Sequence, residues 1–503
     1  MLSCISSATL HGVDGSPVSV EVHVSNGLPG FTVVGLPDAA VRESRDRVRA
    51  ALLSSGLTWP LRRVTVNLAP SGVRKNGSGL DLPIAVGLLV ASGQLEEHAV
   101  AGKSFIGELG LDGSLRSVAG VIPMVDTLAA TPNHRVVVPK DSAGEAGLAG
   151  TSGLLVASSL NELVSCLNGH NSWPEYEASA PDDRPKPHGP DLADVRGQIV
   201  ARRALEIAAA GSHHILFVGT PGSGKTMLAA RLSGLLPSLT RDESIEVSRI
   251  YSAAGMAPGA LPSRPPMRAP HHSSSEVSIV GGGTSAVRPG EISLAHCGVL
   301  FFDELGEFPA TVLDLLRQPL EEGEIRLSRS RVSVTFPSRF QLVAAMNPCP
   351  CGERETGGTC RCLPSALARY TRRISGPLLD RFDLAVPMSR PDPDDLFGGP
   401  PGESTAVVAE RVAQAREQAT QRGVKANAYL PSSILNEVAP LDVGAANLLE
   451  RRLRSGAISA RGFHRIHRVA LTIADLDSSA KVTECHVAEA VQLRVARDFL
   501  VPD

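Results

Sequence analysis

The chain has 503 residues, too many for a single hydrophobic core, and the usual size of domains predicts about three of them. With a formal net charge of −3 it is not a strongly basic protein, so any contact with DNA has to come from local patches of charge. No apolar run reaches the roughly 18 residues that a membrane span requires, and the longest, residues 82–91, contains Pro83. The first residues lack the charged and apolar regions of a signal peptide. We therefore expect a cytoplasmic protein without a membrane partner.

Short β-like runs alternate with segments of helical spacing in residues 1–170, which predicts an α/β domain. Residues 171–190 hold five prolines, many charges and little apolar content, and this composition is typical of an exposed linker. A second α/β unit is expected over residues 191–395. The expected elements of the first domain are strands at 18–24, 31–34, 64–68 and 135–139 and helices at 38–55 and 82–92.

The second unit opens with the pattern G-x-x-x-x-G-K-T at residues 219–226, a P-loop. The apolar run 215–218 before it fits a buried strand, and leucines at helical spacing in residues 227–236 follow it. In such a turn, backbone N–H groups point at phosphate oxygens. Lys225 would reach the β- and γ-phosphates and the Thr226 hydroxyl would ligate Mg²⁺, whereas a glycine-rich turn without ligand is the alternative. The residues expected to bind ATP are Gly219, Thr220, Pro221, Gly222, Ser223, Gly224, Lys225 and Thr226.

Two further apolar runs end in polar side chains that suit hydrolysis. Residues 299–302 are followed by Asp303, which would hold the Mg²⁺ shell, and Glu304, which would polarise the attacking water as general base. Residues 340–346 end at Asn347. This amide would orient the water beside the γ-phosphate, or it merely starts the turn before the following proline.

Residues 391–402 are rich in proline and glycine and are expected to form a loop. The pattern of residues 403–503 after it predicts an all-α lid, with helices over 404–422, 432–438, 445–455, 460–476 and 483–500. Arg381, shortly before that loop, supplies a cation of the kind that phosphoryl transfer often receives from a neighbouring subunit. It equally fits a surface salt bridge. Arg461 opens a lid helix that also bears Arg465 and Arg468, one of which would return to the phosphates unless the three form a solvated basic face.

Four of the eight cysteines form two C-x-C pairs separated by eight residues: Cys349, Cys351, Cys360 and Cys362. Four thiolates in a short loop can close a tetrahedral Zn²⁺ site in a reducing cytosol. The usual spacing of such sites is C-x-x-C, so the pattern is less specific, and a redox pair or unligated thiols remain as alternatives.

The order of P-loop, Asp303-Glu304, Asn347, Arg381 and Arg461 before a helical lid resembles an AAA+ ATPase. Three longer segments resemble the magnesium-chelatase-like AAA+ group more specifically. Residues 268–273, with the glycines 281–283, resemble its helix-two insert. Residues 323–329 resemble its hairpin, and residues 375–383 resemble the segment that carries its arginine finger. Residues 30–38 and 67–72 match the ComM (YifB) family.

This resemblance implies a ring-forming, hexameric ATPase in which Arg381 completes the site of the neighbouring subunit. Family members are associated with branch migration of DNA during natural transformation, which implies branched or single-stranded DNA as a partner. A magnesium-chelatase-type chaperone for metal insertion is the alternative. Against it, Asp477-Ser478-Ser479 does not form the D-x-S-x-S pattern of the chelatase partner domain.

The first domain resembles the protease domain of Lon, but the catalytic pair is missing. Aligning residues 75–77 with the Lon motif puts Gly79 at the nucleophile position and Ser78 one place early, and the segment 121–123 offers no lysine. Without a base a hydroxyl is not activated, so we expect the fold without its chemistry. By family analogy we expect the hairpin and the insert to be pore-facing loops. Candidates for contacts with DNA phosphates are arginines 326, 329, 331, 361, 369, 372 and 373 with His271 and His272, although for each residue taken singly ordinary surface charge is the favoured interpretation.

Overall fold

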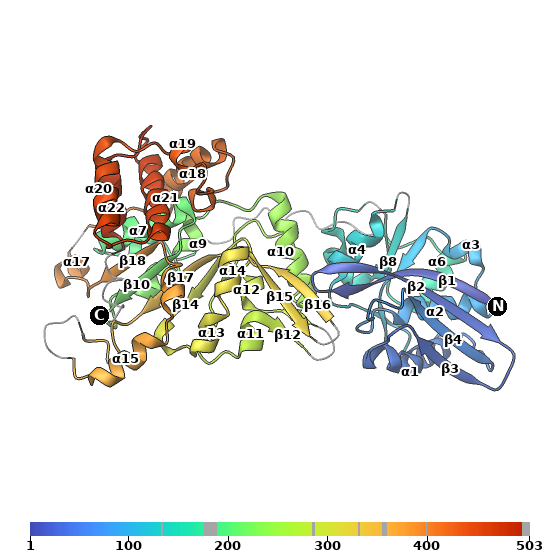
Figure 1. Cartoon of the computed structure of the whole chain (residues 1–503). Coiled ribbons are helices and arrows are strands. Elements are labelled where there is room, and N and C mark those ends of the chain that lie inside the picture. Colours follow the sequence, from blue (N-terminus) through green and yellow to red (C-terminus); the bar gives the residue numbers. More distant parts are fainter. Residues whose placement is uncertain are drawn as a thin grey trace.

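The computed structural model describes residues 1–131, 134–151, 153–175, 189–283, 287–329, 332–354, 360–398 and 400–494. Two large sheets lie along the length of the molecule, and a bundle of helices covers one end (Figure 1). Most of the expected linker and residues 495–503 lie outside the described residues. Among the described residues, no helix combines the length and the apolar character needed to cross a membrane.

The N-terminal sheet has seven strands in the order β3-β4-β2-β1-β5-β8-β9 and is mixed, with β2 antiparallel to both of its neighbours. Helix α2 is buried at every position, as expected for a helix that is apolar all round. The strands are β1 (Leu2–His11), β2 (Asp14–Ser25), β3 (Gly30–Val34), β4 (Arg63–Ala69), β5 (Lys103–Phe105), β6 (Glu108–Leu109), β7 (Leu115–Arg116), β8 (Arg135–Pro139) and β9 (Leu154–Ala157). The helices are α1 (Ala39–Ser54), α2 (Asp81–Ala91), α3 (Glu97–Val100), α4 (Val121–Ala129), α5 (Ala143–Gly147) and α6 (Leu160–Leu167).

The central sheet has five parallel strands in the order β11-β14-β17-β10-β18. They are β10 (Ile215–Gly219), β11 (Met267–Arg268), β14 (Val299–Phe302), β17 (Gln341–Met346) and β18 (Leu384–Met388). Every residue of β10, β14 and β17 is buried, as in parallel sheets covered on both faces. Because the strands are parallel, the turns that follow β10, β14 and β17 meet at one edge of the sheet.

The helices of this region lie on both faces of the central sheet and in its connections. They are α7 (Ile199–Gly211), α8 (Lys225–Ala229), α9 (Leu232–Leu235), α10 (Arg241–Ala253), α11 (Glu276–Val280), α12 (Glu291–Leu294), α13 (Ala310–Asp314), α14 (Arg317–Glu322), α15 (Pro364–Arg372), α16 (Gly376–Leu379) and α17 (Pro393–Phe397). Two small antiparallel pairs complete it: β12 (Gly281–Gly282) with β13 (Arg288–Pro289), and the hairpin of β15 (Glu324–Arg329) and β16 (Val332–Pro337).

The prediction of one helix over residues 227–236 is wrong. Helix α8 ends at Ala229 and α9 begins at Leu232, because the buried Arg231 side chain takes over a helical acceptor. Its Nη1 donates to the Met227 carbonyl at 2.7 Å, the oxygen that the Arg231 N–H would use in a continuous helix. That N–H instead donates to Leu228 O at 3.1 Å, one residue closer.

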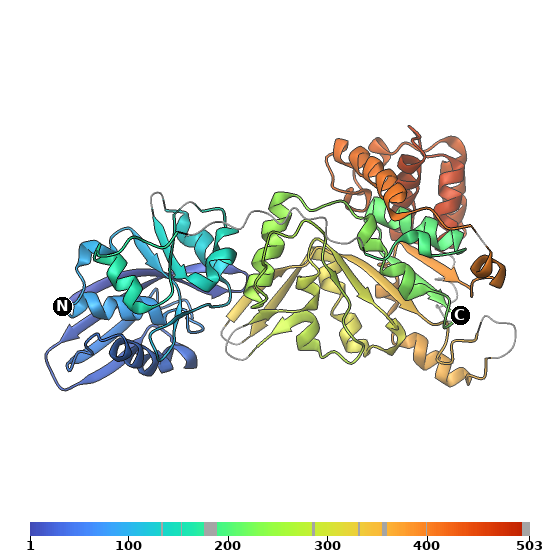
Figure 2. The same cartoon turned by 180° about the vertical axis from the view of Figure 1, so that it is seen from behind.

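The helical lid consists of α18 (Thr405–Gln421), α19 (Leu435–Val438), α20 (Val443–Arg454), α21 (Ala460–Leu476) and α22 (Glu484–Gln492). It stacks on the end of the central sheet that carries α7 and β18, on the side away from the N-terminal sheet (Figures 1 and 2). Buried residues of α7, β18, α18 and α21 form one apolar cluster, so the lid and the central sheet share a core.

The N-terminal sheet docks onto the central region at two places. The Arg249 guanidinium of α10 pairs with Asp126 of α4 at 2.7 Å. At the second place the turn between β1 and β2 meets the β15–β16 hairpin: His11 Nε2 lies 3.2 Å from Ser333 O, and Val13 belongs to the apolar cluster that contains Val334.

Candidate functional site

The P-loop turns at the end of β10 and brings Lys225 inward. Its Nζ donates to Gly219 O at 2.7 Å and to Thr220 O at 2.9 Å. Gly224 has φ +87°, a left-handed conformation that favours glycine and starts α8. Burial lowers the pKa of the Lys225 ammonium, and the nearby Asp303 carboxylate opposes this shift. The lysine is therefore held by the oxygens of its own loop, with its charge facing the turn.

Thr226 and Asp303, expected as the Mg²⁺ ligands, lie side by side. Thr226 Oγ1 donates to Asp303 Oδ2 at 2.7 Å, and the other carboxylate oxygen accepts the Glu304 N–H at 2.9 Å. A hydroxyl and a carboxylate are hard oxygen donors of the kind that Mg²⁺ takes together with phosphate oxygens. These two residues therefore fit the ion.

Asn347 also faces the P-loop. Its Oδ1 accepts a hydrogen bond from Lys225 Nζ at 3.2 Å, so the side chain contacts the P-loop in addition to standing before the turn at Pro348. Its backbone carbonyl accepts from the buried Tyr370 hydroxyl at 3.1 Å. Side chains at the ends of β10, β14 and β17 thus converge on one point.

Glu304 points elsewhere. Its backbone has φ +52°, and its Oε2 lies 3.4 Å from Nδ1 of His272. The His272 ring meets Phe308 edge-on and stacks on His271 with 4.0 Å between the ring centroids. Sequence reasoning missed this contact, because the two side chains come from distant segments that no motif links.

Arg381 lies at the junction with the lid. Its guanidinium forms an ion pair with Glu321, and its side chain is 12% exposed. Burial lowers its pKa, as do the positive charges of Arg465, Arg461 and Arg317. Within the described part of the chain, neither Arg381 nor the exposed Arg461 has a hydrogen bond or ion pair to the P-loop.

The other two lid arginines are engaged elsewhere. Arg465 Nη1 lies 2.6 Å from Asp383 Oδ1 and 2.7 Å from the Arg381 carbonyl. Arg468 donates to Leu430 O at 2.8 Å. Arg468 therefore links two segments of the lid, and Arg465 links the lid to the residues just before β18.

The cysteine sulfurs come together as expected for a metal site. The Sγ atom of Cys349 lies 3.3 Å from that of Cys351 and 3.8 Å from that of Cys360, and Cys351 and Cys360 are 3.7 Å apart. All four sulfurs, with Cys362, lie within 4.8 Å of one another. A tetrahedral zinc with Zn–S bonds of about 2.3 Å holds sulfurs about 3.8 Å apart, so the residues fit Zn²⁺.

A second group of potential ligands, Glu246, His296 and Cys297, does not fit a metal as well. The Arg339 N–H donates to His296 Nδ1 at 3.1 Å, so the imidazole proton lies on Nε2. That nitrogen faces Glu246 Oε2 at 3.0 Å and donates to it. A metal ion would have to displace this proton.

The residues aligned with the Lon motif have other partners in this structure. The Ser78 hydroxyl donates to Glu108, and the buried Lys75 donates to the Pro70 carbonyl. Ile122 is buried in α4. Among the described residues, no basic group bonds the Ser78 hydroxyl.

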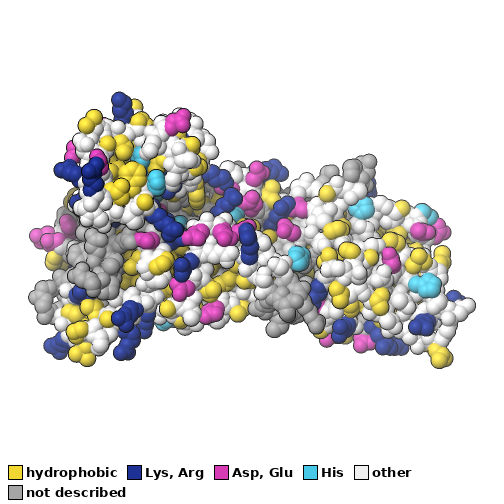
Figure 3. Space-filling model, in the orientation of Figure 1, with side chains coloured by type: hydrophobic (Ala, Val, Ile, Leu, Met, Phe, Trp, Pro, Cys, Tyr) yellow, Lys and Arg dark blue, Asp and Glu magenta, His cyan; other side chains and the backbone are white. Residues whose placement is uncertain are grey.

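The arginines expected at DNA differ in their surroundings. Arg326 pairs with Glu324, whereas Arg373 donates to Gly306 O at 2.6 Å. Arg331 lies outside the described residues, and so does the side chain of Arg329. Lys and Arg side chains gather over α15 (Figure 3), where the exposed ones are Arg361, Arg369 and Arg372.

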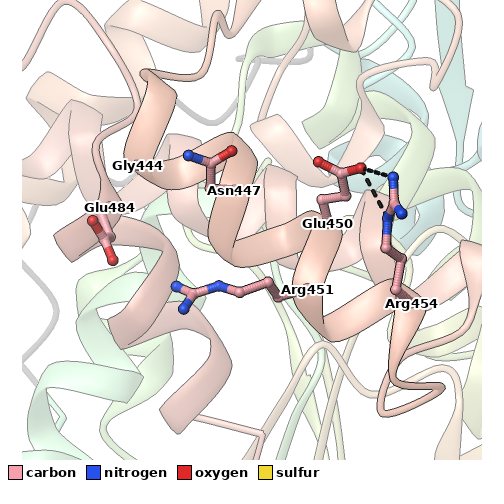
Figure 4. Close-up of a pocket in the computed structure, with 6 residues that line it drawn as sticks. All are labelled: Gly444, Asn447, Glu450, Arg451, Arg454 and Glu484. Carbon is pink, nitrogen blue, oxygen red and sulfur yellow. Dashed lines mark hydrogen bonds and ion pairs between the residues drawn. The ribbon is translucent and has the colours of Figure 1, made fainter.

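A hollow of about 580 Å³ lies on the lid, away from the P-loop. Its lining is confined to α20 and α22, and Glu450 and Arg454 pair with one another along α20 (Figure 4). It is therefore not part of the nucleotide site.

Comparison with known families agrees with this arrangement. The model "Magnesium chelatase, subunit ChlI" matches residues 191–396, its C-terminal counterpart matches 402–494, and "Subunit ChlI of Mg-chelatase" matches 20–142. "Competence protein ComM" of Haemophilus influenzae is 45% identical over 98% of this chain and 97% of its own length. The chain belongs to the ComM/YifB family of magnesium-chelatase-like AAA+ ATPases.

Other relatives support the same placement. "Uncharacterized protein YifB" of Escherichia coli is 44% identical over 99% of this chain and 98% of its own length. "Magnesium-chelatase 38 kDa subunit" of Acidiphilium rubrum is 26% identical over 57% of this chain and 84% of its own length. Membership of the ComM/YifB family implies ATP and Mg²⁺ as cofactors and the oligomeric habit of AAA+ proteins.

Proposed function

We propose that this chain is an ATP-hydrolysing ring motor, hexameric in its active form, that acts on DNA as a branch-migration helicase. The observation that carries the ATPase part is the convergence of Lys225, Thr226, Asp303 and Asn347 at the ends of three adjacent strands. The C-terminal edge of a parallel sheet is where α/β folds place their ligands.

Each residue has a distinct role in this proposal. The backbone of residues 219–226 cradles the phosphates, and Lys225 exchanges the carbonyls of Gly219 and Thr220 for phosphate oxygens. Thr226 and Asp303 hold Mg²⁺, which supplies charge neutralisation when bound. Asn347 orients the attacking water, and Glu304 takes its proton after turning away from His272.

The arginines support a site shared between subunits. Arg381 and Arg461 lie together at the edge of the lid, without a described bond to the P-loop of their own chain. Phosphoryl transfer gains from a cation on the γ-phosphate, and a neighbouring subunit in a ring can provide it. We therefore assign Arg381 to the site of the next subunit, with Arg461 beside it.

DNA as the partner rests on two observations. One of the relatives that cover nearly the whole chain bears the name "Competence protein ComM". The exposed arginines 361, 369 and 372 form a basic face around α15, on a chain whose net charge is only −3. Local arginines on one face are the feature that contacts with the phosphate backbone require.

The test is ATP hydrolysis by the full chain, with and without forked DNA, together with unwinding of a Holliday junction. We expect DNA to stimulate turnover. Lys225→Ala should abolish turnover, and Glu304→Gln should lower it by about 10²–10⁴-fold, the usual contribution of a general base. Turnover that ignores DNA, with no junction processed, would contradict the motor.

Zinc in the cysteine cluster completes the proposal. Four thiolates at these separations form a closed structural site with no position open for catalysis. Metal analysis of the purified protein should find one zinc per chain.

A chelatase-type chaperone is the second candidate, favoured by the match of residues 191–396 to a magnesium chelatase subunit. ATP-dependent insertion of Mg²⁺ into a porphyrin, measured by the absorbance of the product, distinguishes it from the motor. We expect no insertion.

A further inference from the structure

We propose that zinc in the cysteine cluster sets the geometry of the nucleotide site, so that the affinity for ATP depends on occupancy of the metal. The inference rests on the proposed ATPase function and adds a control element to the same site. Three contacts on the segment between β17 and α15 carry it.

The cysteine loop packs directly on the P-loop. Gly352 lies between Cys351 and Glu353 with φ +81°, and a Cβ built on it would come within 2.5 Å of Pro221 Cδ. Only glycine allows this approach, and Pro221 is the third residue of the phosphate-binding turn. A displacement of the cysteine loop would therefore also move the backbone of the P-loop, which we assign to phosphate binding.

Arg390 fastens the same contact from the other side. Its Nη2 lies 2.8 Å from Glu353 Oε1, and its Nε donates to Pro221 O at 3.4 Å. One guanidinium thus bridges the cysteine loop and the P-loop.

The loop is also continuous with Asn347. Cys349 follows it by two residues and is fully buried, so a zinc bound there would fix the chain directly after Asn347. On the return path the Tyr370 hydroxyl donates to Asn347 O at 3.1 Å. The Tyr370 ring lies against Gly306, where an added Cβ would come within 2.3 Å of it.

These contacts join the metal site to two sides of the phosphate pocket. A metal held by the four thiolates would tie Cys349 and Cys351 to Cys360 and Cys362, and this constraint is lost when the metal is removed. The loop then no longer holds Pro221 and Asn347 in place. We expect ATP affinity to fall about tenfold, at the lower end of the effect of removing support around a site.

The experiment compares zinc-loaded and zinc-stripped full-length protein, with a fluorescent ATP analogue as the probe. Zinc is removed with a chelator under reducing conditions and measured by mass spectrometry of the metal. Stripping should raise the Kd for the analogue about tenfold, and added ZnCl₂ should restore it. Circular dichroism shows whether the stripped protein remains folded.

Two variants separate the metal from its contacts. The double variant Cys360→Ser/Cys362→Ser should lose zinc and bind the analogue like stripped protein. Arg390→Ala should keep one zinc and still bind the analogue several-fold more weakly. As the matched control, Cys4→Ser/Cys485→Ser removes two exposed thiols far along the chain from the cluster and should change neither quantity.

The outcomes are distinguishable. Equal Kd values for loaded and stripped protein, or no bound zinc, or a disulfide within the cluster of freshly purified protein, overturn the inference alone. If zinc-loaded protein binds no ATP analogue at all, the proposed ATPase fails and takes the inference with it. Reversible loss of affinity with zinc removal supports both.

Discussion

Nδ1 of His272 lies 3.4 Å from Oε2 of Glu304, and this contact turns the predicted general base toward the helix-two insert. The carboxylate stands on a backbone with φ +52°, while Asp303, the residue before it, faces the P-loop. The two adjacent carboxylates thus serve different neighbours. Any partner that moves the insert would release Glu304 toward the phosphates.

We predict that His272→Ala raises the basal rate of ATP hydrolysis. Both side chains are partly exposed, at 38% and 58%, so the contact is weak and its loss should increase turnover at most about fivefold, which corresponds to about 1 kcal/mol. Stimulation by DNA should shrink by a similar factor. His271→Ala keeps the contact and serves as the control. A fall in the basal rate of His272→Ala would mean that the histidine orients Glu304 for catalysis.

Two arginines of α21 should separate stability from activity. Arg465 pairs with the buried Asp383 at 2.6 Å, whereas Arg461 is exposed. Arg465→Ala leaves a buried carboxylate without its main partner and should lower the free energy of unfolding by about 3–5 kcal/mol. Arg461→Ala should leave stability unchanged and slow ATP hydrolysis. Urea unfolding and ATP turnover of both variants test this, and the reverse assignment would refute it.

The same pair predicts a pH dependence. Burial alone would raise the pKa of Asp383, but the charges of Arg465 and His213 outweigh burial and hold the pKa well below its usual range. A carboxylate with a lowered pKa stabilises the fold fully above its unfolded pKa of about 4, and the stabilisation is lost as the pH falls further. Wild type should therefore keep this contribution at pH 5. Arg465→Ala, in which burial dominates and raises this pKa, should instead regain part of its lost stability as the pH falls toward 5, because the folded state then binds the proton more readily than the unfolded chain.

The sequence predicts those helices and strands whose apolar pattern is uninterrupted within the segment itself. The strands before the P-loop and Asp303 are mostly apolar runs, the strand before Asn347 is apolar after Gln341, and α21 begins and ends at the predicted residues. Strand β1 was not predicted, because small polar residues interrupt its apolar pattern. Ser3 and Ser7 are buried there and donate to Gly87 O and Phe105 O, acceptors that only the folded chain supplies.

The contacts in the candidate site also fall into two classes, those that motifs predict and those that no motif predicts. Thr226 and Asp303 are 77 residues apart, but the sequence predicts them together because each belongs to a motif that supplies a ligand to the same Mg²⁺ ion. The packing of Gly352 on Pro221 and the contact of His272 with Glu304 join segments far apart in the chain, and no spacing rule links them. The resemblance to AAA+ proteins supplied the order of the motifs but not these contacts.

Mixing two inactive variants tests the shared site. Arg381→Ala keeps its own P-loop, and Lys225→Ala keeps the arginine for its neighbour. Each alone should be nearly inactive, since an arginine supplied to the γ-phosphate is worth about 10³–10⁵ in rate. Random assembly of equal amounts pairs an intact P-loop with an intact arginine at about one interface in four, so about a quarter of the wild-type rate should return. No recovery in mixed rings would place Arg381 in the site of its own chain.

The β1–β2 turn should control the response to DNA through the hairpin. Val13 is 6% exposed and shares an apolar cluster with Val334 and Ile325 of β15 and β16, while His11 lies 3.2 Å from Ser333 O. Val13→Asp buries an unpaired charge at this contact, which displaces the hairpin from the N-terminal sheet.

We expect Val13→Asp to keep basal ATP hydrolysis within about twofold of wild type. The substitution rearranges the contact between the β1–β2 turn and the hairpin and leaves the core around the P-loop intact. Stimulation by forked DNA should drop several-fold, since the hairpin no longer has a fixed position. Leu28→Asp places the same charge in the loop between β2 and β3 of the same domain, at a residue that is 89% exposed, and it should behave as wild type. Equal DNA stimulation in both variants would show that the N-terminal sheet does not position the hairpin, whereas a loss confined to Val13→Asp would give the N-terminal domain a mechanical role.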